Sequence, residues 1–334
     1  MSALMEIQDV TRRFGGGRTL LGRPKPAVHA VQGVSFEVRQ GETLGIVGES
    51  GCGKSTLAKL LVGLQRPSAG EVSLGGAKLH DRAVFDRRAL AKRVQYVFQD
   101  PLSSLNPRKT IRQILEAPLI HLLQMPAAAR RDKLMEIMEA VRLRPEFLER
   151  YPHEFSGGQA QRIGIARALA AEPEILVLDE PVSALDVSVQ AQVLNLLDQL
   201  KADFDLTYIF ISHDLAVVES VSDRVLVMYF GRVVEEGTAG ELFRRPLHPY
   251  TRLLLSSAPV PGRKGIGAEA KIAELPDPLA PPPGCAFAAR CPHASDLCRE
   301  TLPVLEREGE SAYACHHPRK GEPWPPTNAE AAGN

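Results

Sequence analysis

The chain has 334 residues, of which 44% are apolar and 24% charged, a composition ordinary for a soluble globular protein of about two domains. Lysine plus arginine and aspartate plus glutamate each total 40, and this balance argues against a surface that wraps nucleic acid or binds a strongly anionic membrane. No apolar run approaches the roughly 18 residues of a spanning helix, and the N-terminus lacks a basic region followed by an apolar stretch. We therefore expect a cytoplasmic protein without a signal peptide.

The first part of the chain, residues 5–47, is predicted to form short strands. Val34, Phe36 and Val38 alternate with polar residues, the pattern of a half-buried strand. Residues 15–26 are rich in glycine, proline and arginine and are expected to form a loop between two strands. Phe14 directly precedes this loop, where an aromatic ring can stack on an adenine or belong to an edge-strand core, and both interpretations stay open.

A phosphate-binding loop of the form G-x-x-x-x-G-K-S follows the apolar run at residues 44–47 and precedes leucines at helical spacing. Its glycines allow backbone N–H groups to wrap a phosphate chain, and the helix N-terminus favours the same negative charge. Lysine at this place reaches the β- and γ-phosphates, and the serine after it can ligate Mg²⁺. A chance glycine-rich turn is the alternative, but the flanking pattern argues against it. The residues assigned to nucleotide binding here are Gly48, Glu49, Ser50, Gly51, Cys52, Gly53, Lys54, Ser55 and Thr56.

Residues 93–99 have the pattern of a strand and end on Gln99. The chain then changes character, because apolar residues recur at helical spacing. We predict an inserted helical subdomain at about 101–165. The residues Ser156, Gly157, Gly158 and Gln159 lie within it, ahead of a predicted helix at 163–169.

Two further strands are predicted to be buried because they are continuously apolar. The run at 175–178 ends in Asp179 and Glu180, and the run at 208–212 ends at His213. In a parallel sheet such carboxyl ends meet ligands. Alternating strands and helices predict an α/β fold with a mostly parallel core.

These motifs, in this order, resemble the ATP-binding subunits of ABC transporters over residues 5 to about 255. Phe155 stands where that family usually has leucine, a mild departure. The resemblance implies a P-loop NTPase fold, that is, a RecA-like core with an antiparallel β subdomain and a helical subdomain. It places the ATPase domain at 1–240 and a small cysteine-rich C-terminal extension at 241–334.

The resemblance also implies a role for each motif in ATP hydrolysis. Asp179 is expected to hold Mg²⁺, Glu180 to act as general base or orient the water, and His213 to contact the γ-phosphate. Gln99 is expected to contact Mg²⁺ or the water and to sense the membrane partner. Residues 156–159 are expected to bind the ATP of an opposite subunit in a head-to-tail dimer. For His213 alone, a structurally satisfied histidine is the alternative.

Two segments resemble the dipeptide/oligopeptide importer branch, residues 99–108 (Q-D-P-L-S-S-L-N-P-R) and 245–251 (R-P-L-H-P-Y-T). The closest likeness is to the second ATPase of the pair, often called the F-type subunit. The implied partners are a second ABC ATPase subunit, two integral membrane permease subunits and an extracytoplasmic peptide-binding protein, with the chain peripheral on the cytoplasmic face of the inner membrane. For His248 we expect a turn or docking role rather than metal ligation.

Two alternative functions remain. Another small solute, such as nickel or an oligosaccharide, can be the cargo, because an ATPase subunit does not touch it. A soluble ABC ATPase acting on DNA or ribosomes is disfavoured, because no sustained heptads separate Lys54 from Ser156 and the chain carries one cassette.

The tail from Pro261 onward holds 12 of the 26 prolines, too many for a conventional packed domain on its own, so we expect a metal to stabilise it. Four cysteines lie there at intervals of five, six and sixteen residues, without tight C-x₂-C pairs. Four thiolates suit an iron–sulfur cluster, and similar tails in the branch imply a [4Fe–4S] cluster. Zinc, with His293, His316 or His317 as further ligands, and unliganded thiols are the alternatives. The predicted cluster ligands are Cys285, Cys291, Cys298 and Cys315.

Overall fold

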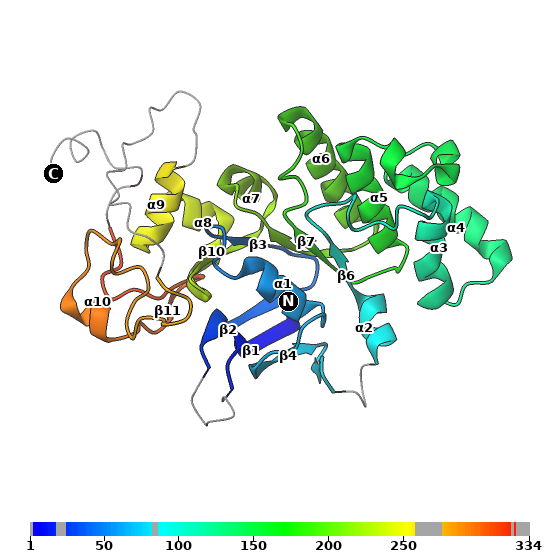
Figure 1. Ribbon diagram of the computed structural model, residues 1–334. Helices are drawn as coiled ribbons and strands as arrows, with labels where there is room; N and C mark the ends of the chain where they lie inside the picture. The colour runs from blue at the N-terminus through cyan, green and yellow to red at the C-terminus, as the bar shows by residue number, and fades with distance from the viewer. Residues whose placement is uncertain (1–2, 18–24, 82–85, 258–275, 322–323, 325–334) are drawn as a thin grey trace.

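A computed structural model describes residues 3–17, 25–81, 86–257, 276–321 and 324. Two sheets build it, one of eight strands and one of four (Figure 1). The four-stranded sheet is antiparallel, in the order β2-β1-β4-β5. Its strands are β1 (Ala3–Gly15), β2 (Ala27–Arg39), β4 (Ala69–Leu74) and β5 (Ala77–Lys78).

The first two strands are longer than the short strands predicted, at 13 residues each. Register shifts interrupt their pairing at four places, and such bulges bend the strands and increase their local twist. Val34, Phe36 and Val38 are buried, as their alternation predicted.

The eight-stranded sheet has the order β11-β12-β10-β9-β3-β8-β7-β6. Strands β9, β3, β8, β7 and β6 are mutually parallel, and β10 turns back antiparallel to β9 to form a hairpin. Every residue of β3, β7 and β8 is buried, which explains their continuous apolar runs. The strands are β3 (Thr43–Val47), β6 (Val94–Val97), β7 (Ile175–Asp179), β8 (Thr207–Ile211), β9 (Arg224–Tyr229), β10 (Arg232–Thr238), β11 (Glu306–Glu308) and β12 (Ser311–Tyr313).

Helices cover the large sheet and fill the space between the two sheets. Helix α1 (Lys54–Leu61) buries Leu57, Leu60 and Leu61 in one core with residues of both sheets. The inserted helical region contains α3 (Ile111–His121), α4 (Ala127–Ala140), the short turns η1 (Pro145–Glu149) and η2 (Pro152–Glu154), and α5 (Gly157–Leu169). The remaining helices are α2 (Arg87–Arg93), α6 (Val187–Asp203), α7 (Leu215–Val221), α8 (Ala239–Arg244), α9 (Pro249–Ser257) and α10 (Asp296–Glu300). Across the described ranges, we find no helix with the length and apolar character needed to cross a membrane.

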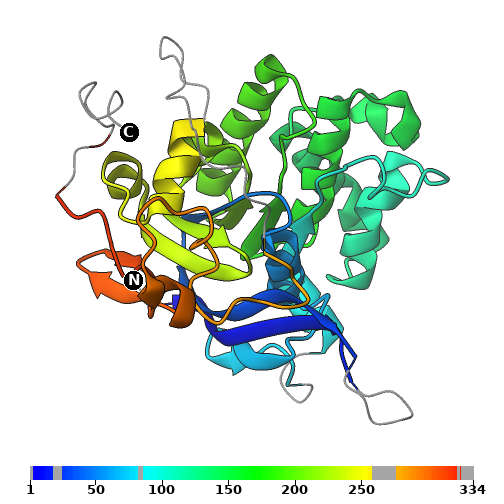
Figure 2. The same cartoon turned by 60° about the vertical axis from the view of Figure 1, so that its left-hand side comes forward.

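The proline-rich tail is an integral part of the fold, contrary to the expectation that it needs a metal to be held. Its strand β12 pairs with β10, with Glu235 opposite Tyr313. The ring of Phe287 is 1% exposed and lies 5.4 Å, centroid to centroid, from the rings of both Tyr229 and Tyr250. Figure 2 shows the orange tail lying beside β10 and β2, on the side of the molecule away from the helical region. The tail therefore packs its apolar side chains into the hydrophobic core of the large sheet.

The shared core predicts that the tail contributes to global stability. Phe287→Ala should lower the free energy of unfolding by about 3–5 kcal/mol, because it opens a cavity between buried aromatic rings. Leu279→Ala, at a position 47% exposed in the same tail, is the matched control and should change it by under about 1 kcal/mol. Denaturant unfolding of both variants measures this, and equal small losses would mean that the tail is an independent appendage.

Candidate functional site

The candidate site is a cleft of about 600 Å³ at the carboxyl edge of the large sheet. Its walls come from the phosphate loop, the ends of β6, β7 and β8, the β9–β10 turn, β2 and the tail. The lining residues are Val28, His29, Ala30, Ser50, Gly51, Gly53, Lys54, Ser55, Thr56, Gln99, Glu180, His213, Phe230, Gly231 and Pro278.

The phosphate loop is held tightly between β3 and α1. Gly53 has φ +106°, and a Cβ there would lie 2.2 Å from the carbonyl oxygen of Ala30, so only glycine fits. The Gly231 N–H donates to the Cys52 carbonyl at 2.8 Å, and the Cys52 side chain is buried beneath the loop, where burial raises its pKa. The loop and the N-terminus of α1 together form a concave surface of N–H donors suited to an anion.

The Lys54 side chain lies inside the loop. Its Nζ donates to the carbonyls of Gly48, at 2.7 Å, and Glu49, at 3.0 Å. These contacts keep the ammonium of Lys54, a residue only 5% exposed, next to the cleft, where a point charge attracts phosphate.

Glu49, the second residue of the loop, is bound from the C-terminal part of the chain. Its backbone N–H donates to the Tyr250 hydroxyl at 2.9 Å. Its carboxylate accepts two hydrogen bonds from the Arg290 guanidinium, at 2.8 and 2.9 Å. The hydrogen bonds to Glu49 raise the pKa of Arg290, so the guanidinium stays charged.

Oxygen donors meet where α1 approaches the end of β7. The Ser55 hydroxyl donates to Oδ1 of Asp179 at 3.2 Å, and the Tyr96 hydroxyl donates to Oδ2 of the same carboxylate. Burial, followed by the hydrogen bond and charge of Asp179, raises the pKa of Tyr96, which therefore stays protonated and remains a donor. Hydroxyl and carboxylate oxygens are the ligands that Mg²⁺ prefers, so Ser55 and Asp179 fit that ion.

The side chains of Gln99, Glu180 and His213 converge at one carboxylate oxygen. Oε2 of Glu180 accepts from Nε2 of Gln99 at 2.9 Å and lies 3.2 Å from Nδ1 of His213. Glu180 has a left-handed backbone, φ +49°, and its N–H donates to the Ile211 carbonyl at 2.9 Å. This conformation ends β7 and directs the carboxylate to the cleft, a strained arrangement typical of functional sites.

The motif at residues 156–159 lies elsewhere, at the exposed N-terminus of α5. Ser156 caps the helix, because its hydroxyl accepts from the Gln159 N–H at 3.4 Å and its own N–H donates to Oε1 of Gln159 at 3.1 Å. Gly157 and Gly158 form the first turn. Among the described residues, none of these four lines the cleft beside Lys54.

Phe14 likewise lies beside the cleft rather than in its wall. It pairs across β1 and β2 with Val28, which does line the cleft. The Arg12 guanidinium covers its ring at 4.6 Å from the centroid. This position is compatible with both interpretations of the sequence.

The predicted iron–sulfur cluster is wrong. Across the ranges that the structure describes, no group of three or more His, Cys, Asp or Glu residues is arranged to hold a metal ion, which also removes the zinc alternative. The four tail cysteines line one cavity of only about 10 Å³, at the lower limit for a single water. Burial raises the pKa of Cys285 and Cys291, and that of Cys315 to about 12, so these thiols stay protonated and pack as small apolar groups.

His248 has the turn role expected for it. It is 1% exposed, its N–H donates to Glu235, and its Nδ1 accepts from the Tyr250 N–H at 3.0 Å. Burial lowers its pKa to about 3, so the ring is neutral and fixes the start of α9.

Sequence reasoning missed Tyr96 and Arg290. Of the residues that line the cleft, it missed Val28, His29, Ala30, Phe230, Gly231 and Pro278. Tyr96 lies three residues before Gln99, in a strand that the sequence predicted. The parallel pairing of β6 with β7 is the signal that could have placed it next to Asp179. Pro278 lines the cleft from the tail, and Arg290 contacts Glu49 of the phosphate loop. The tail has no local pattern that predicts these contacts.

A strand, a phosphate loop with lysine and serine, and a facing pair of carboxylates define a P-loop nucleotide-binding protein. Comparison with known families agrees. Residues 31–183 match the ABC transporter family, and residues 234–298 match the family of oligopeptide/dipeptide transporter C-terminal regions.

Several characterised relatives are similar over nearly their whole length. The chain is 48% identical to the oligopeptide transport ATP-binding protein AppF of Bacillus subtilis, over 94% of this chain and 97% of that protein. It is also 48% identical to the oligopeptide transport ATP-binding protein OppF of Escherichia coli, over 93% and 95% respectively. The chain therefore belongs to the family of peptide-transport ATP-binding proteins of ABC transporters.

Solved structures confirm the ABC ATPase fold. The ATP-binding cassette MJ0796, determined as a dimer in a post-hydrolysis state bound to ADP and Pi, matches with a TM-score of 0.61 and 30% identity, over 70% of this chain and 98% of that one. The cassette CbiO1 from Clostridium perfringens matches with a TM-score of 0.62 and 26% identity, over 73% and 91%.

Two glycines of α5 predict opposite effects of the same substitution. A Cβ at Gly158 would lie 2.4 Å from Cγ1 of Val189 on α6, whereas a Cβ at Gly164 would meet nothing within 4 Å. Gly158→Ala should cost about 1–3 kcal/mol of stability, because it forces the start of α5 away from α6. Gly164→Ala, the matched control, should stabilise by about 0.4–1 kcal/mol. Thermal unfolding measures both, and equal effects would contradict this packing.

Proposed function

We propose that this chain binds ATP with Mg²⁺ and hydrolyses it to drive the uptake of di- and oligopeptides by an ABC importer. The observation that carries the proposal is the convergence of Glu180, Gln99 and His213 in the same cleft as Lys54 and Ser55. Hydrolysis of a γ-phosphate needs charge neutralisation and a positioned water, and this set of groups supplies both.

The proposed roles follow from where each side chain lies. Loop N–H groups within residues 50–53 and the Lys54 ammonium bind the β- and γ-phosphates. Ser55 and Asp179 hold Mg²⁺, which when bound neutralises charge on the phosphates. Glu180 orients or deprotonates the water and Gln99 contacts the same water or the ion.

Two further contacts complete the proposed nucleotide site. His213 contacts the γ-phosphate, since its ring lies at the cleft beside Glu180. Phe14 remains the proposed stacking partner for adenine, next to Val28 in the cleft wall.

Peptides are the proposed cargo because the characterised relatives are named for oligopeptide, dipeptide and di/tripeptide transport. The matching C-terminal region supports the same branch. Nickel or oligosaccharide uptake, by contrast, has no support from these names.

The proposed partners are two membrane permeases, an extracytoplasmic peptide-binding protein and a second ATPase subunit, identical or paralogous. Phe98 and Leu102 are 37% and 42% exposed beside Gln99, so an apolar surface for the permeases lies next to a cleft residue. The chain is proposed to sit peripherally on the cytoplasmic face of the inner membrane.

The second ATPase subunit is proposed to complete the site from across a head-to-tail dimer. The exposed start of α5 offers Ser156 and two glycine N–H groups to an anion, yet lies outside this chain's own cleft. The dimeric form of the solved cassette supports this arrangement.

Glu180→Gln should leave ATP affinity unchanged and lower the hydrolysis rate about 100-fold or more, because the amide cannot accept a proton. Glu174→Gln, at the other end of β7 and paired with Arg93 in the native chain, is the control and should hydrolyse ATP normally. Nucleotide titration and steady-state phosphate release measure the two quantities. Hydrolysis within about twofold of the native rate would remove Glu180 from the reaction.

The same variant tests the cargo. In cells that lack this chain, the native chain should restore uptake of a labelled tripeptide and Glu180→Gln should not. Restored uptake of nickel or an oligosaccharide without peptide uptake would keep the ATPase role and replace the substrate.

Ser156→Arg should spare ATP binding by this chain and stop hydrolysis at the site that it completes in the partner. The added side chain and charge occupy the exposed helix start that faces the other subunit. Ser257→Arg, on the exposed end of α9, is the control. Single-turnover hydrolysis in the assembled transporter measures the effect, and unimpaired turnover at both sites would refute the dimer arrangement.

A further inference from the structure

We propose that the C-terminal extension is part of the nucleotide site and sets ATP affinity through one ion pair, Arg290 with Glu49. Arg290 is a positioning residue in this proposal, because it acts on the phosphate loop through Glu49 and does not line the cleft. The inference rests on the proposed binding of ATP by that loop.

The contact between extension and loop is direct and specific. Two guanidinium nitrogens of Arg290 meet the two carboxylate oxygens of Glu49 at 2.8 and 2.9 Å, the parallel geometry of a strong ion pair. The side chains are only 15% and 27% exposed, so solvent screens the pair less than a surface ion pair.

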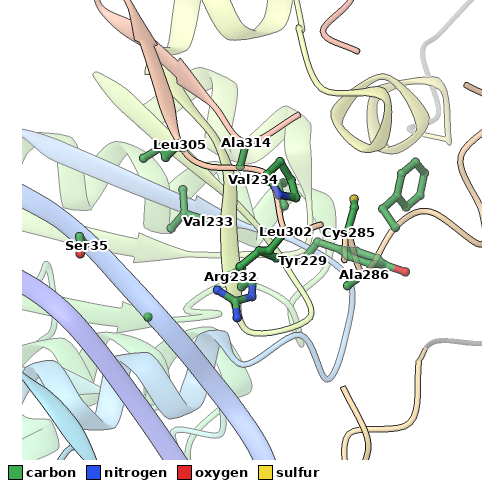
Figure 3. Close-up of a pocket in the computed structure, with 13 residues that line it drawn as sticks. Ser35, Tyr229, Arg232, Val233, Val234, Cys285, Ala286, Leu302, Leu305 and Ala314 are labelled. Carbon is green, nitrogen blue, oxygen red and sulfur yellow. The ribbon is translucent and has the colours of Figure 1, made fainter. Parts of the chain in front are cut away.

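The guanidinium is fixed from the extension's side. Its central carbon lies 5.9 Å from the ring centroid of Tyr229 and 5.8 Å from that of Phe287. The backbone N–H of Arg290 donates to the Phe287 carbonyl at 2.9 Å. Phe287 is itself buried in the shared core. Figure 3 shows Tyr229 beside Ala286 and Cys285, where the extension packs against β10. Arg290 is therefore presented to the loop by rigid neighbours.

The charge of Glu49 needs a partner at this place. A polyanion binding to the loop meets a carboxylate on the loop itself, and like charges disfavour binding. Among the described residues, Arg290 is the only cationic side chain within ion-pair distance of Glu49. The nearby Lys54 ammonium contacts backbone carbonyls instead. The extension thus removes an electrostatic penalty that the loop sequence creates.

This arrangement predicts unequal effects of the two single neutral substitutions. Arg290→Gln leaves an unpaired carboxylate in the loop and should weaken ATP binding about tenfold. Glu49→Gln leaves an unpaired cation near the polyanion and should not weaken ATP binding in this way. The double variant should bind ATP within about threefold of the native chain, because both charges are gone. The ATP turnover number of Arg290→Gln should stay near native, since Glu180, Gln99 and His213 are untouched, so the effect of this substitution falls on KM.

The experiment is an equilibrium titration of the full purified chain with ATP and Mg²⁺, followed by steady-state kinetics. Arg299→Gln is the matched control, since Arg299 lies in the same extension in an exposed pair with Asp296 and should bind ATP natively. Raising the salt from about 0.05 to about 0.5 M should shrink the Arg290→Gln deficit, because screening weakens charge repulsion.

Three outcomes separate the possibilities. Equal losses of ATP affinity in both single variants, with no recovery in the double variant, would overturn the proposal. The ion pair would then have only a structural role in holding the loop. Native affinity in every variant would also overturn it, while leaving ATP binding intact. A native chain that binds no ATP would instead refute the proposed function.

Discussion

The structure depends on the shared register of three parallel strands, β3, β8 and β7. Ile46 of β3 pairs with Ile211 of β8, and Ile211 pairs with Asp179 of β7, so the three strands end in one row. The phosphate loop, His213 and the two carboxylates at 179–180 all leave the sheet from that row. Because these strands are buried on both faces, a slip of one residue would exchange their apolar side chains between two packed layers, and the register is strongly fixed.

The opposite end of the sheet is held by buried charge. Arg224, at the start of β9, donates to the carboxylates of Glu42 at 2.9 Å and Glu236 at 2.7 Å, and all three are at most 7% exposed. Burial raises the pKa of Glu42, so the arginine is needed to keep this carboxylate ionised. Removing one partner from such a group costs about 3–5 kcal/mol. The triad joins the turn before β3 to β9 and β10, and β10 in turn carries the extension's strand β12.

Sequence motifs that directly follow apolar strands predicted the part of the site at the ends of those strands. The loop at 48–56, Asp179 with Glu180, and His213 follow strands whose apolar runs are visible in the sequence. Parallel pairing then implied that they meet. Gln99 was placed by its motif, although β6 ends two residues earlier, at Val97.

The extension could not be predicted in the same way. Arg290 contacts Glu49, 241 positions earlier in the sequence, and Phe287 packs on Tyr229 and Tyr250. No periodic pattern in the sequence predicts these contacts. The number of cysteines indicated metal, yet spacing alone does not specify geometry, and the thiols pack around a cavity of about 10 Å³. The high proline content led to the wrong expectation that a metal holds the extension. The extension instead packs Phe287 into the core of the large sheet.

The phosphate loop is therefore held at two ends by different parts of the chain. At its helical end, Ser55 is bound to Asp179 on the sheet. At its strand end, Glu49 is bound to Tyr250 and Arg290 of the C-terminal part. Glu180, the proposed catalytic carboxylate, directly follows Asp179 in the sequence and so belongs to the contact at the helical end of the loop. A change in the extension therefore reaches the loop without passing through the groups proposed for hydrolysis. An extension attached in this way can adjust how tightly nucleotide is held while leaving the chemical step to the sheet edge.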